Sequence, residues 1–457
     1  MVTVDSSHPG AAIPDTFLGI STEWSSVVNY LGDGSGNASP AVVRLLSAFA
    51  GEGNHPTLRI GGNSADEAWW NPTGATPRPT NITIDVGSMH VATLASLNAM
   101  LATTLIPDLD LALQGVYSDA PGNAAALAQA ISAALPAGAV RAFEIGNEPD
   151  LWYKNGLRAS SYTFSGWQAD YDAFTAGIDA VLSPPPPYGA PALSGKSWLP
   201  NLDALYAGEK ANLALATAHR YPFNVCNGTA PPAVTALLAD AASQGAASEF
   251  APHIQTARAA GVDFRVAELN SVACGGADGV SNVYAAALWG ADVAFQLAWA
   301  GAVGLNFHTP GSYYAVFTLS SGALTVEPLY YGMRFFSLAV PAGATPVTAT
   351  VAPATPTLHA WASVGLDGKT RLALLSLDAA TGGTVTLQAL SASGATLTRL
   401  HAPAADAKSG LTLGGQTWEA STDGTPQGTA AAESVIFDQG NATIVLPPLD
   451  AVVVTFD

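Results

Sequence analysis

The chain has 457 residues, of which 11% are charged, and 16 Lys plus Arg against 35 Asp plus Glu give a formal net charge of −19. Such an acidic surface repels polyanions, which argues against nucleic acid as a partner and, more weakly, against long sulfated polysaccharides. No run of about 18 apolar residues without Gly, Pro or polar breaks occurs, so we expect no membrane-spanning helix.

Strand-like and Ala-rich segments alternate from about residue 17 to residue 338, as in a parallel (β/α)8 barrel. Composition and apolar spacing predict helices at Ala41–Ala50, Val91–Leu101, Ala124–Leu135, Tyr171–Leu182, Ala233–Ser243 and Asn282–Ala300. Strands are predicted at Phe17–Ser21, Thr57–Gly61, Leu109–Val116, Val140–Gly146, Gly189–Ser194, Ala216–Tyr221, Asp263–Glu268 and Val303–His308. We therefore expect an α/β fold, with a (β/α)8 TIM barrel as the catalytic domain over residues 15–338.

After Leu338 the sequence changes to short apolar or alternating segments rich in Thr, Val, Ala and Gly, which favours an antiparallel β-sandwich. Its strands are predicted at Leu372–Leu377, Thr384–Leu387, Thr396–Leu400, Ser434–Phe437, Ala442–Leu446 and Ala451–Phe456. Val2–Val4 is predicted to pair with the last of these. Residues 1–14 plus 339–457 would then form a second, all-β domain.

Two predicted barrel strands end in a carboxylate. Phe143–Ile145 leads into Asn147-Glu148-Pro149, where Pro149 has no N–H and cannot extend the strand, and Glu268 closes another apolar strand 120 positions later. A side chain at the C-terminal end of a barrel strand points into the substrate cleft. Two carboxyl groups placed in this way are what cleavage of a glycosidic bond requires.

These motifs resemble the acid/base and nucleophile signatures of the retaining glycoside hydrolases of clan A. Within that clan, Leu58–Asp66, His219–Pro222 and Asn306–His308 resemble family 79, which contains β-glucuronidases and heparanases. The resemblance covers most of the first 340 residues. It implies a barrel followed by a carboxy-terminal β-domain that the amino-terminal segment joins.

We predict that Glu148 is the acid/base and Glu268 the nucleophile. A Glu at a helix start is the alternative for Glu148; for Glu268 the alternatives are a solvated strand-end Glu, or Glu144 as the nucleophile in its place. Clan resemblance implies that Asn147 hydrogen-bonds the sugar 2-hydroxyl.

Other polar residues near predicted strand ends are candidates for substrate binding. Tyr221 is expected to hydrogen-bond Glu268, with simple aromatic packing as the alternative. Glu23 is expected to bind distal sugar hydroxyls, and Asn63 and Asp66 lie on the loop after the second strand. Arg59 suits a bond to the nucleophile region, and a structural ion pair is the alternative.

A uronic acid also needs a partner for its carboxylate. The polar, Gly-ended loop from residue 270 to residue 276 could present backbone N–H groups at Ala273, Cys274 and Gly275. Tyr313 and Tyr314 follow the eighth strand and could add phenolic donors. Resemblance to family 79 places carboxylate recognition in these two regions.

Cys226 and Cys274 are the two cysteines, and both fall on loops above consecutive predicted strands. A disulfide between them is plausible, with two unlinked thiols as the alternative. No His stands at ligand spacing from them, so no metal site is expected. A disulfide and four Asn-X-Ser/Thr sequons would suit a secreted protein whose signal peptide is absent from this sequence. The sequons are at Asn37, Asn81, Asn227 and Asn441.

The combined prediction is a retaining exo-β-glucuronidase that acts by double displacement and needs no cofactor, and the sequence leaves open whether it accepts 4-O-methylated glucuronic acid. Its expected partner is a carbohydrate substrate, with neither nucleic acid nor membrane, and it is expected to be a monomer. The alternatives are a heparanase-like endo-enzyme, a clan A glycosidase for a neutral sugar, and a carbohydrate-binding protein on an inactive barrel. Retention of configuration predicts carboxyl groups about 5 Å apart.

Overall fold

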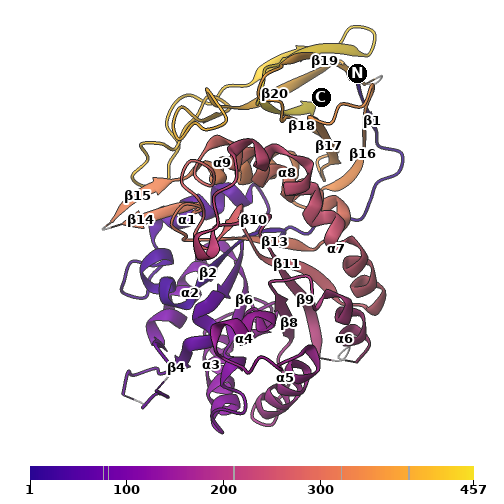
Figure 1. The fold of residues 1–457 in the computed structure, drawn as a ribbon. Coiled ribbons are helices and arrows are strands. Elements are labelled where there is room, and N and C mark those ends of the chain that lie inside the picture. The colour runs from indigo at the N-terminus through magenta and orange to yellow at the C-terminus, as the bar shows by residue number, and fades with distance from the viewer. Residues whose placement is uncertain (76, 81, 209–211, 321, 390–391) are drawn as a thin grey trace.

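The computed structural model describes the chain apart from residues 76, 81, 209–211, 321 and 390–391, and contains a closed barrel of eight parallel strands (Figure 1). The order around the barrel is β11-β13-β2-β3-β6-β7-β8-β9. These strands are β2 (Leu18–Glu23), β3 (Thr57–Gly61), β6 (Thr104–Leu109), β7 (Phe143–Ile145), β8 (Tyr188–Leu193), β9 (Leu213–Arg220), β11 (Asp263–Leu269) and β13 (Gly304–His308). The predicted fold class is confirmed.

Helices surround this barrel, and their apolar faces bury the outer surface of the strands (Figure 1). Within the described residues, none of them combines the length and the apolar character needed to cross a membrane. They are α1 (Pro40–Ala50), α2 (Ser88–Leu101), α3 (Ala120–Ala134), α4 (Trp152–Asn155), α5 (Phe164–Asp179), α6 (Leu202–Gly208), α7 (Asp240–Ala260), α8 (Tyr284–Ala300) and α9 (Pro328–Ala339).

Two predicted elements are wrong. The third strand was predicted at Leu109–Val116, but β6 ends at Leu109 and a short 3-10 helix follows. Pro107 makes this strand hard to predict from the sequence, because proline cannot donate a backbone hydrogen bond to a neighbouring strand. In the structure, Pro107 is the last residue of β6 that pairs with β3. A helix was predicted at Ala233–Ser243, whereas α7 begins at Asp240 and continues through Pro252, because its buried face packs on α8 and β11.

The carboxy-terminal part forms one curled sheet in the order β21-β20-β24-β18-β17-β16-β1-β19-β23, with β22 paired to β20. Its two sides enclose a separate apolar core, in which Leu374 and Val452 face Val385 and Ile444. The strands are β1 (Val2–Asp5), β16 (Thr345–Val351), β17 (Leu358–Val364), β18 (Thr370–Ser376), β19 (Gly383–Gln388), β20 (Gly394–His401), β21 (Thr412–Leu413), β22 (Glu433–Ile436), β23 (Asn441–Leu446) and β24 (Ala451–Phe456).

The amino-terminal strand crosses into this sheet, but not beside the predicted partner. Val2–Val4 lies in β1, which pairs antiparallel with β16 and parallel with β19, and not with β24. The sequence could not identify this partner because β16 was not among the predicted strands. From this crossing we propose the domain boundaries 15–338 for the barrel and 1–14 plus 339–457 for the sheet domain.

The outer face of the sheet rests on α8 and α9 (Figure 1). Beside that apolar contact, His359 on β17 lies between two barrel carboxylates: its Nδ1 is 2.8 Å from Asp292 Oδ1 and its Nε2 is 3.1 Å from Asp240 Oδ1. Asp292 also accepts hydrogen bonds from Ser243 Oγ and Trp361 Nε1. Burial disfavours the charged imidazolium, but Asp292 and then Asp240 outweigh it and raise the pKa of His359 to about 9.

We expect His359→Gln to lower the unfolding temperature at pH 6 and to have a smaller effect at pH 10. A His with a raised folded-state pKa stabilises fully below its unfolded pKa of about 6.5 and loses this contribution as the pH rises through about 9. The contribution is about 3 kcal/mol. Thermal unfolding of the variant and of the control His8→Gln at both pH values measures it; equal losses at pH 6 and pH 10 would contradict it.

Candidate active site

The nucleophile candidate Glu268 sits where β11 is irregular. The pairing of β11 with β9 shifts between Val266 and Glu268, so that Ala267 is an extra residue in the strand. Such a bulge re-aims the next side chain. Glu268 thereby lies in the barrel mouth with its side chain 9% exposed.

The acid/base candidate Glu148 stands three residues beyond β7 in an unusual backbone conformation. Its φ of 46° lies in the left-handed region, which costs about 1 kcal/mol or more for a residue other than glycine. Its N–H donates to Ala192 O at 3.1 Å, which fixes the turn against β8. His219 Nδ1 lies 3.0 Å from Glu148 Oε1 and fixes the carboxylate.

Barrel closure brings the two carboxylates together. One oxygen of Glu148, one oxygen of Glu268 and a ring nitrogen of His219 all lie within 4.8 Å of one another. These three residues offer the oxygen and nitrogen atoms that could hold a metal ion. The bond between His219 and Glu148 already engages two of the three residues with each other.

Arg59 on β3 is fully buried and joins the strand ends. Its guanidinium donates to Glu144 Oε2 at 2.6 Å, Glu268 Oε2 at 2.8 Å, Asn147 Oδ1 at 2.9 Å and Asp108 Oδ2 at 3.2 Å. Both alternatives considered for Arg59, a bond to the nucleophile and a structural ion pair, are therefore present. Glu144 lies beneath the site with no exposed surface, too deep to meet a sugar.

The surroundings of Glu268 favour its charged form. Burial opposes ionisation, but His308, His219 and Arg59 together with the hydrogen bond from Tyr221 outweigh burial and lower the pKa of Glu268 to about 2. The Tyr221 hydroxyl donates to Glu268 Oε1 at 2.8 Å. Burial and then the Glu268 charge raise the pKa of Tyr221 well above its usual value, so this phenol remains a donor.

We expect Tyr221→Phe to lower kcat by roughly 10- to 100-fold and to change KM by less than about threefold. A hydrogen bond to a charged group contributes about 1.5–3 kcal/mol, and every 1.4 kcal/mol or so is tenfold in rate. Steady-state kinetics on an aryl glycoside provides the measurement. An unchanged kcat would mean that Tyr221 only packs at the barrel mouth.

Three other candidates lie at or after barrel strand ends: Glu23 ends β2, Asn63 follows β3 and Asn147 follows β7. Glu23 is ionised: burial opposes its charge, but His308 and Ser64 lower its pKa. Its Oε2 accepts a hydrogen bond from Ser64 N at 2.8 Å. Gly62, with φ of 67°, leaves space for the Glu23 carboxylate, because a Cβ on residue 62 would lie 2.3 Å from Glu23 Oε1. Asn147 Nδ2 is 3.2 Å from Oδ1 of Asn63, which is exposed.

Asp66, a predicted substrate-binding residue, lies behind the turn that carries Asn147. This carboxylate is 5% exposed and accepts from the N–H of Asn147 at 3.3 Å and from Trp152 Nε1 at 2.8 Å. Burial raises its pKa to about 8. Asp66 therefore supports the turn that carries Asn147, and its role in substrate binding stays a prediction.

The loop after β11 packs against the loop after β13. Tyr313 N donates to Gly275 O at 2.7 Å, and a Cβ on Gly276 would lie 2.9 Å from Tyr314 N. Tyr314 is buried beside Tyr221, with ring centroids 6.0 Å apart, whereas Tyr313 is 42% exposed. The predicted loop and both tyrosines thus lie next to the partners of Glu268.

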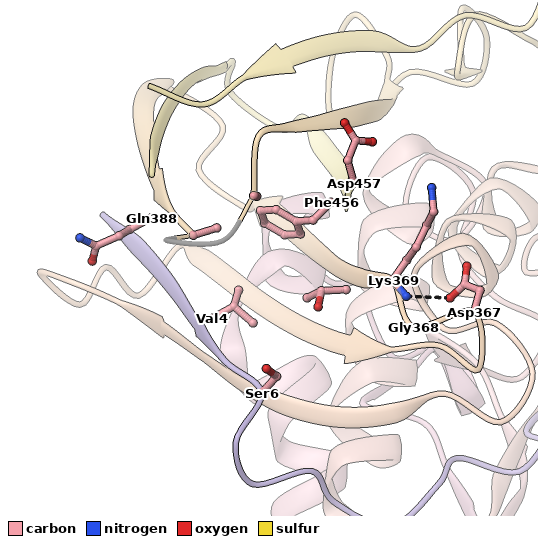
Figure 2. A pocket seen from close by; sticks show the side chains of 11 residues that line it. Val4, Ser6, Asp367, Gly368, Lys369, Gln388, Phe456 and Asp457 are labelled. Carbon is pink, nitrogen blue, oxygen red and sulfur yellow. Dashed lines mark hydrogen bonds between the residues drawn. The ribbon is translucent and has the colours of Figure 1, made fainter. Parts of the chain in front are cut away.

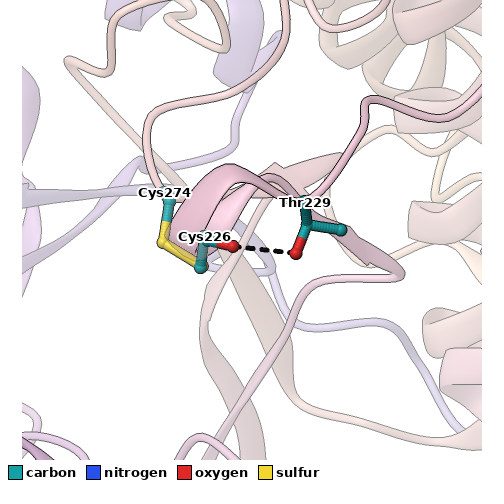
Figure 3. Close-up of a disulfide and its surroundings, with 3 residues drawn as sticks. All are labelled: Cys226, Thr229 and Cys274. Carbon is teal, nitrogen blue, oxygen red and sulfur yellow. Dashed lines mark hydrogen bonds between the residues drawn. A yellow bond between two sulfur atoms is a disulfide. The ribbon is translucent and has the colours of Figure 1, made fainter.

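The same loop carries the disulfide. Cys226 and Cys274 are bonded, with Cα atoms 5.4 Å apart, as Figure 3 shows. Ala273, in the short strand β12 (Val272–Ala273), pairs with β10 (Phe223–Asn224) directly before the bond. Of the four sequon residues, Asn37, Asn227 and Asn441 are exposed, and Asn81 lies outside the described residues.

A cavity of about 710 Å³ lies elsewhere, at one end of the sheet domain (Figure 2). Its lining includes Asp367, Lys369, Phe456 and Asp457. Asp367 is already held by Arg371 at 2.7 Å and by the N–H of Lys369 at 3.0 Å. The paired carboxylates make the barrel mouth the stronger candidate for catalysis.

Sequence reasoning assigned no role to two histidines that the structure brings into the site. His219 contacts Glu148, and His308 Nδ1 lies 3.4 Å from Glu268 Oε2 while its Nε2 lies 3.5 Å from Glu23 Oε1. The signal was available: each stands at or one residue before the end of a barrel strand, next to a candidate site. Their partners lie on other strands, which local patterns do not identify.

Known proteins resemble both parts of this chain. Residues 360–453 match the glycosyl hydrolase family 79 C-terminal beta domain. A beta-glucuronidase from Neurospora crassa is 26% identical over 426 residues, which cover 82% of this chain and 74% of that protein. These matches confirm the resemblance to glycoside hydrolase family 79 that the sequence motifs indicate. A second relative, a beta-glucuronidase from Aspergillus niger, is 28% identical over 64% of this chain, and the match spans 58% of that relative's length.

Solved structures share the fold of this chain. A 4-O-alpha-L-rhamnosyl-beta-D-glucuronidase from Fusarium oxysporum superposes with a TM-score of 0.79 at 24% identity and covers 99% of this chain and 98% of that one. A GH51 arabinofuranosidase from Xanthomonas axonopodis pv. citri gives 0.70 at 17% identity, covering 100% and 99%. At these identities the similarity concerns the fold.

Proposed function

We propose that this family 79 glycoside hydrolase is a retaining exo-β-glucuronidase that removes terminal β-linked glucuronic acid from glycans or glycosides. The observation that carries the proposal is the carboxylate pair: oxygens of Glu148 and Glu268 lie within 4.8 Å. Retaining enzymes place the two carboxyl groups about 5–5.5 Å apart, whereas inverting enzymes need about 6.5–9.5 Å to admit a water. Both curated relatives carry the name beta-glucuronidase.

In the first step, Glu148 protonates the glycosidic oxygen while the Glu268 carboxylate attacks the anomeric carbon. The aglycone leaves as an alcohol, and the sugar becomes an ester of Glu268. In the second step, Glu148 takes a proton from a water that attacks the same carbon and releases the sugar with its configuration retained. Arg59 and Tyr221 hold Glu268 for attack, at 2.8 Å each.

Substrate contacts follow from the polar groups that line the mouth. Asn147, whose Oδ1 accepts from Arg59, directs its Nδ2 to the 2-hydroxyl, and the ionised Glu23 accepts from distal hydroxyls. Backbone N–H groups from Ala273 to Gly275, with Tyr313 and Tyr314, bind the uronate carboxylate. Because the Fusarium enzyme's name describes glucuronic acid substituted at O4, we extend the proposal to 4-O-methylated glucuronic acid.

The place of action follows from the disulfide. A bond between Cys226 and Cys274 persists in oxidising compartments, so the proposed location is extracellular.

Hydrolysis of matched aryl β-glucuronide and aryl β-glucoside tests this function. We expect kcat/KM to favour the glucuronide by at least about 100-fold, because a site built for a charged group leaves its donors unpaired with the neutral sugar. Proton NMR of the first product should show the β-anomer. Preference for a neutral glycoside would discard the uronate assignment, and an α-anomer would discard the double displacement.

A further inference from the structure

The segment from Asn270 to Val283 is attached to three different parts of the molecule. Asn270 Nδ2 donates to His308 O at 3.0 Å and to Tyr314 O at 2.9 Å, which ties its beginning to the eighth barrel strand. Lys408 of the sheet domain forms an ion pair with Asp278 in its middle. The Cys226–Cys274 disulfide ties it to the loop after β9 (Figure 3).

The disulfide lies in a segment where three consecutive residues have positive φ. Cys274, Gly275 and Gly276 have φ values of 66°, 90° and 85°. Gly275 and Gly276 adopt such values readily, whereas Cys274 carries a Cβ and does so at an energetic cost. Such a conformation persists only when surrounding contacts impose it. The covalent bond to Cys226 supplies that constraint directly at the non-glycine residue.

The constrained residues contact Tyr313 and Tyr314, and Tyr314 lies beside Tyr221, which bonds the nucleophile. Gly275 O accepts from Tyr313 N, and Gly276 packs against the backbone of Tyr314, which lies beside Tyr221. A change in this loop would therefore displace the groups proposed to receive the sugar carboxylate. Glu268 itself would be less affected, because Arg59 and Tyr221 hold it from β3 and β9.

The position of the bond also makes it reachable. Cys274 is exposed, and Cys226 lies in a short 3-10 turn with no buried residue. A structural disulfide that only stabilises a core is usually enclosed by apolar side chains. Cys274 is therefore open to the approach of a small thiol from solvent.

We propose that the Cys226–Cys274 disulfide sets the affinity of the active site for anionic sugars, and that small thiol reductants switch the enzyme to a form that binds glucuronides weakly. Two thiols reduce the bond: one thiolate forms a mixed disulfide, and the second releases it as the oxidised reductant, leaving two protein thiols. The inference rests on the proposed glucuronidase function. It adds that specificity depends on the redox state of this loop.

The test compares the oxidised protein, the same protein reduced with dithiothreitol without denaturant, and Cys226→Ala. Cys226 is chosen because it lies outside the predicted binding backbone. We expect KM for an aryl β-glucuronide to rise about tenfold in both altered forms, since the loop must then be ordered on binding. The kcat for the glucuronide should change by less than about twofold. The kcat/KM for any residual cleavage of the matched β-glucoside should also change by less than about twofold. Reoxidation should restore the original KM.

Two controls separate this role from loss of stability. Lys408→Met breaks the exposed ion pair on the same segment, and should change KM by less than about twofold because exposed ion pairs contribute little. Amide hydrogen exchange across residues 270–283 should accelerate on reduction, which also reports on the loop if Cys226→Ala fails to fold.

An unchanged glucuronide KM after complete reduction would overturn the proposal. Equal KM increases in Lys408→Met and in the reduced protein would also overturn it, because the disulfide would then have no special role. If the oxidised protein does not cleave the glucuronide at all, the proposed function fails first, and this inference fails with it.

Discussion

Glu268→Gln is expected to reduce kcat on an aryl β-glucuronide by roughly 10⁴-fold or more, because an amide cannot form the ester intermediate. Gln has nearly the same shape as Glu, so the variant should still fold. The Gln amide NH2 would, however, face a hydrogen-bond donor, either Arg59 at 2.8 Å or the Tyr221 hydroxyl at 2.8 Å. Steady-state kinetics, with thermal unfolding to verify folding, gives the measurement.

A matched control is Glu433→Gln, which makes the same chemical change on the exposed sheet domain strand β22. It should keep full activity. Mass spectrometry adds a direct result: a slow 2-fluoro glucuronide substrate should label the peptide that contains Glu268. Activity in Glu268→Gln within about tenfold of wild type, or a label on Glu144, would reassign the nucleophile.

Glu148→Ala should produce a loss that depends on the leaving group. With a phenyl or alkyl aglycone, which needs protonation, kcat should fall by about 10²- to 10⁴-fold. With a dinitrophenyl aglycone the first step needs no acid, so the ester of Glu268 should form and accumulate. Added azide, which attacks without a general base, should then restore turnover and give the β-glycosyl azide.

The same comparison of leaving groups tests the role of His219, whose Nδ1 lies 3.0 Å from Glu148 Oε1. His219→Gln should show a smaller loss with the same dependence on the leaving group. Uniform losses across all aglycones in Glu148→Ala, or an α-configured azide product, would contradict the assignment of Glu148 and the retaining mechanism.

The sequence determined the fold class and the places where carboxylates would stand. Alternation of strands and helices predicts the barrel, because each parallel strand needs a crossover helix, and the change of composition after residue 338 predicts the second β-domain. Asn147-Glu148-Pro149 and the strand ending in Glu268 are local signals, readable without knowing any partner. The Cys226–Cys274 pairing could be proposed because both residues follow consecutive strands.

Local patterns failed where other contacts outweighed them. Pro107 disfavours a strand prediction for β6, and Gly245 and Pro252 disfavour a helix prediction for most of α7. Packing against neighbouring elements nevertheless keeps both elements in place. For Asp66, predicted as a substrate ligand on the loop after the second strand, the sequence shows nothing of what surrounds the carboxylate. Its burial and its bonds to Asn147 and Trp152 became visible only in three dimensions.

Only the tertiary structure decided how the site is held together. Arg59 bonds Glu144, Asn147 and Glu268 across 85, 88 and 209 positions of sequence, and His308 meets Glu23 and Glu268 on other strands. A strand's periodicity shows which side chains share a face, but not which strand will lie opposite. Closure of the barrel fixes those partners and sets the charge of Glu268, because ionisation depends on the nearest charges in space.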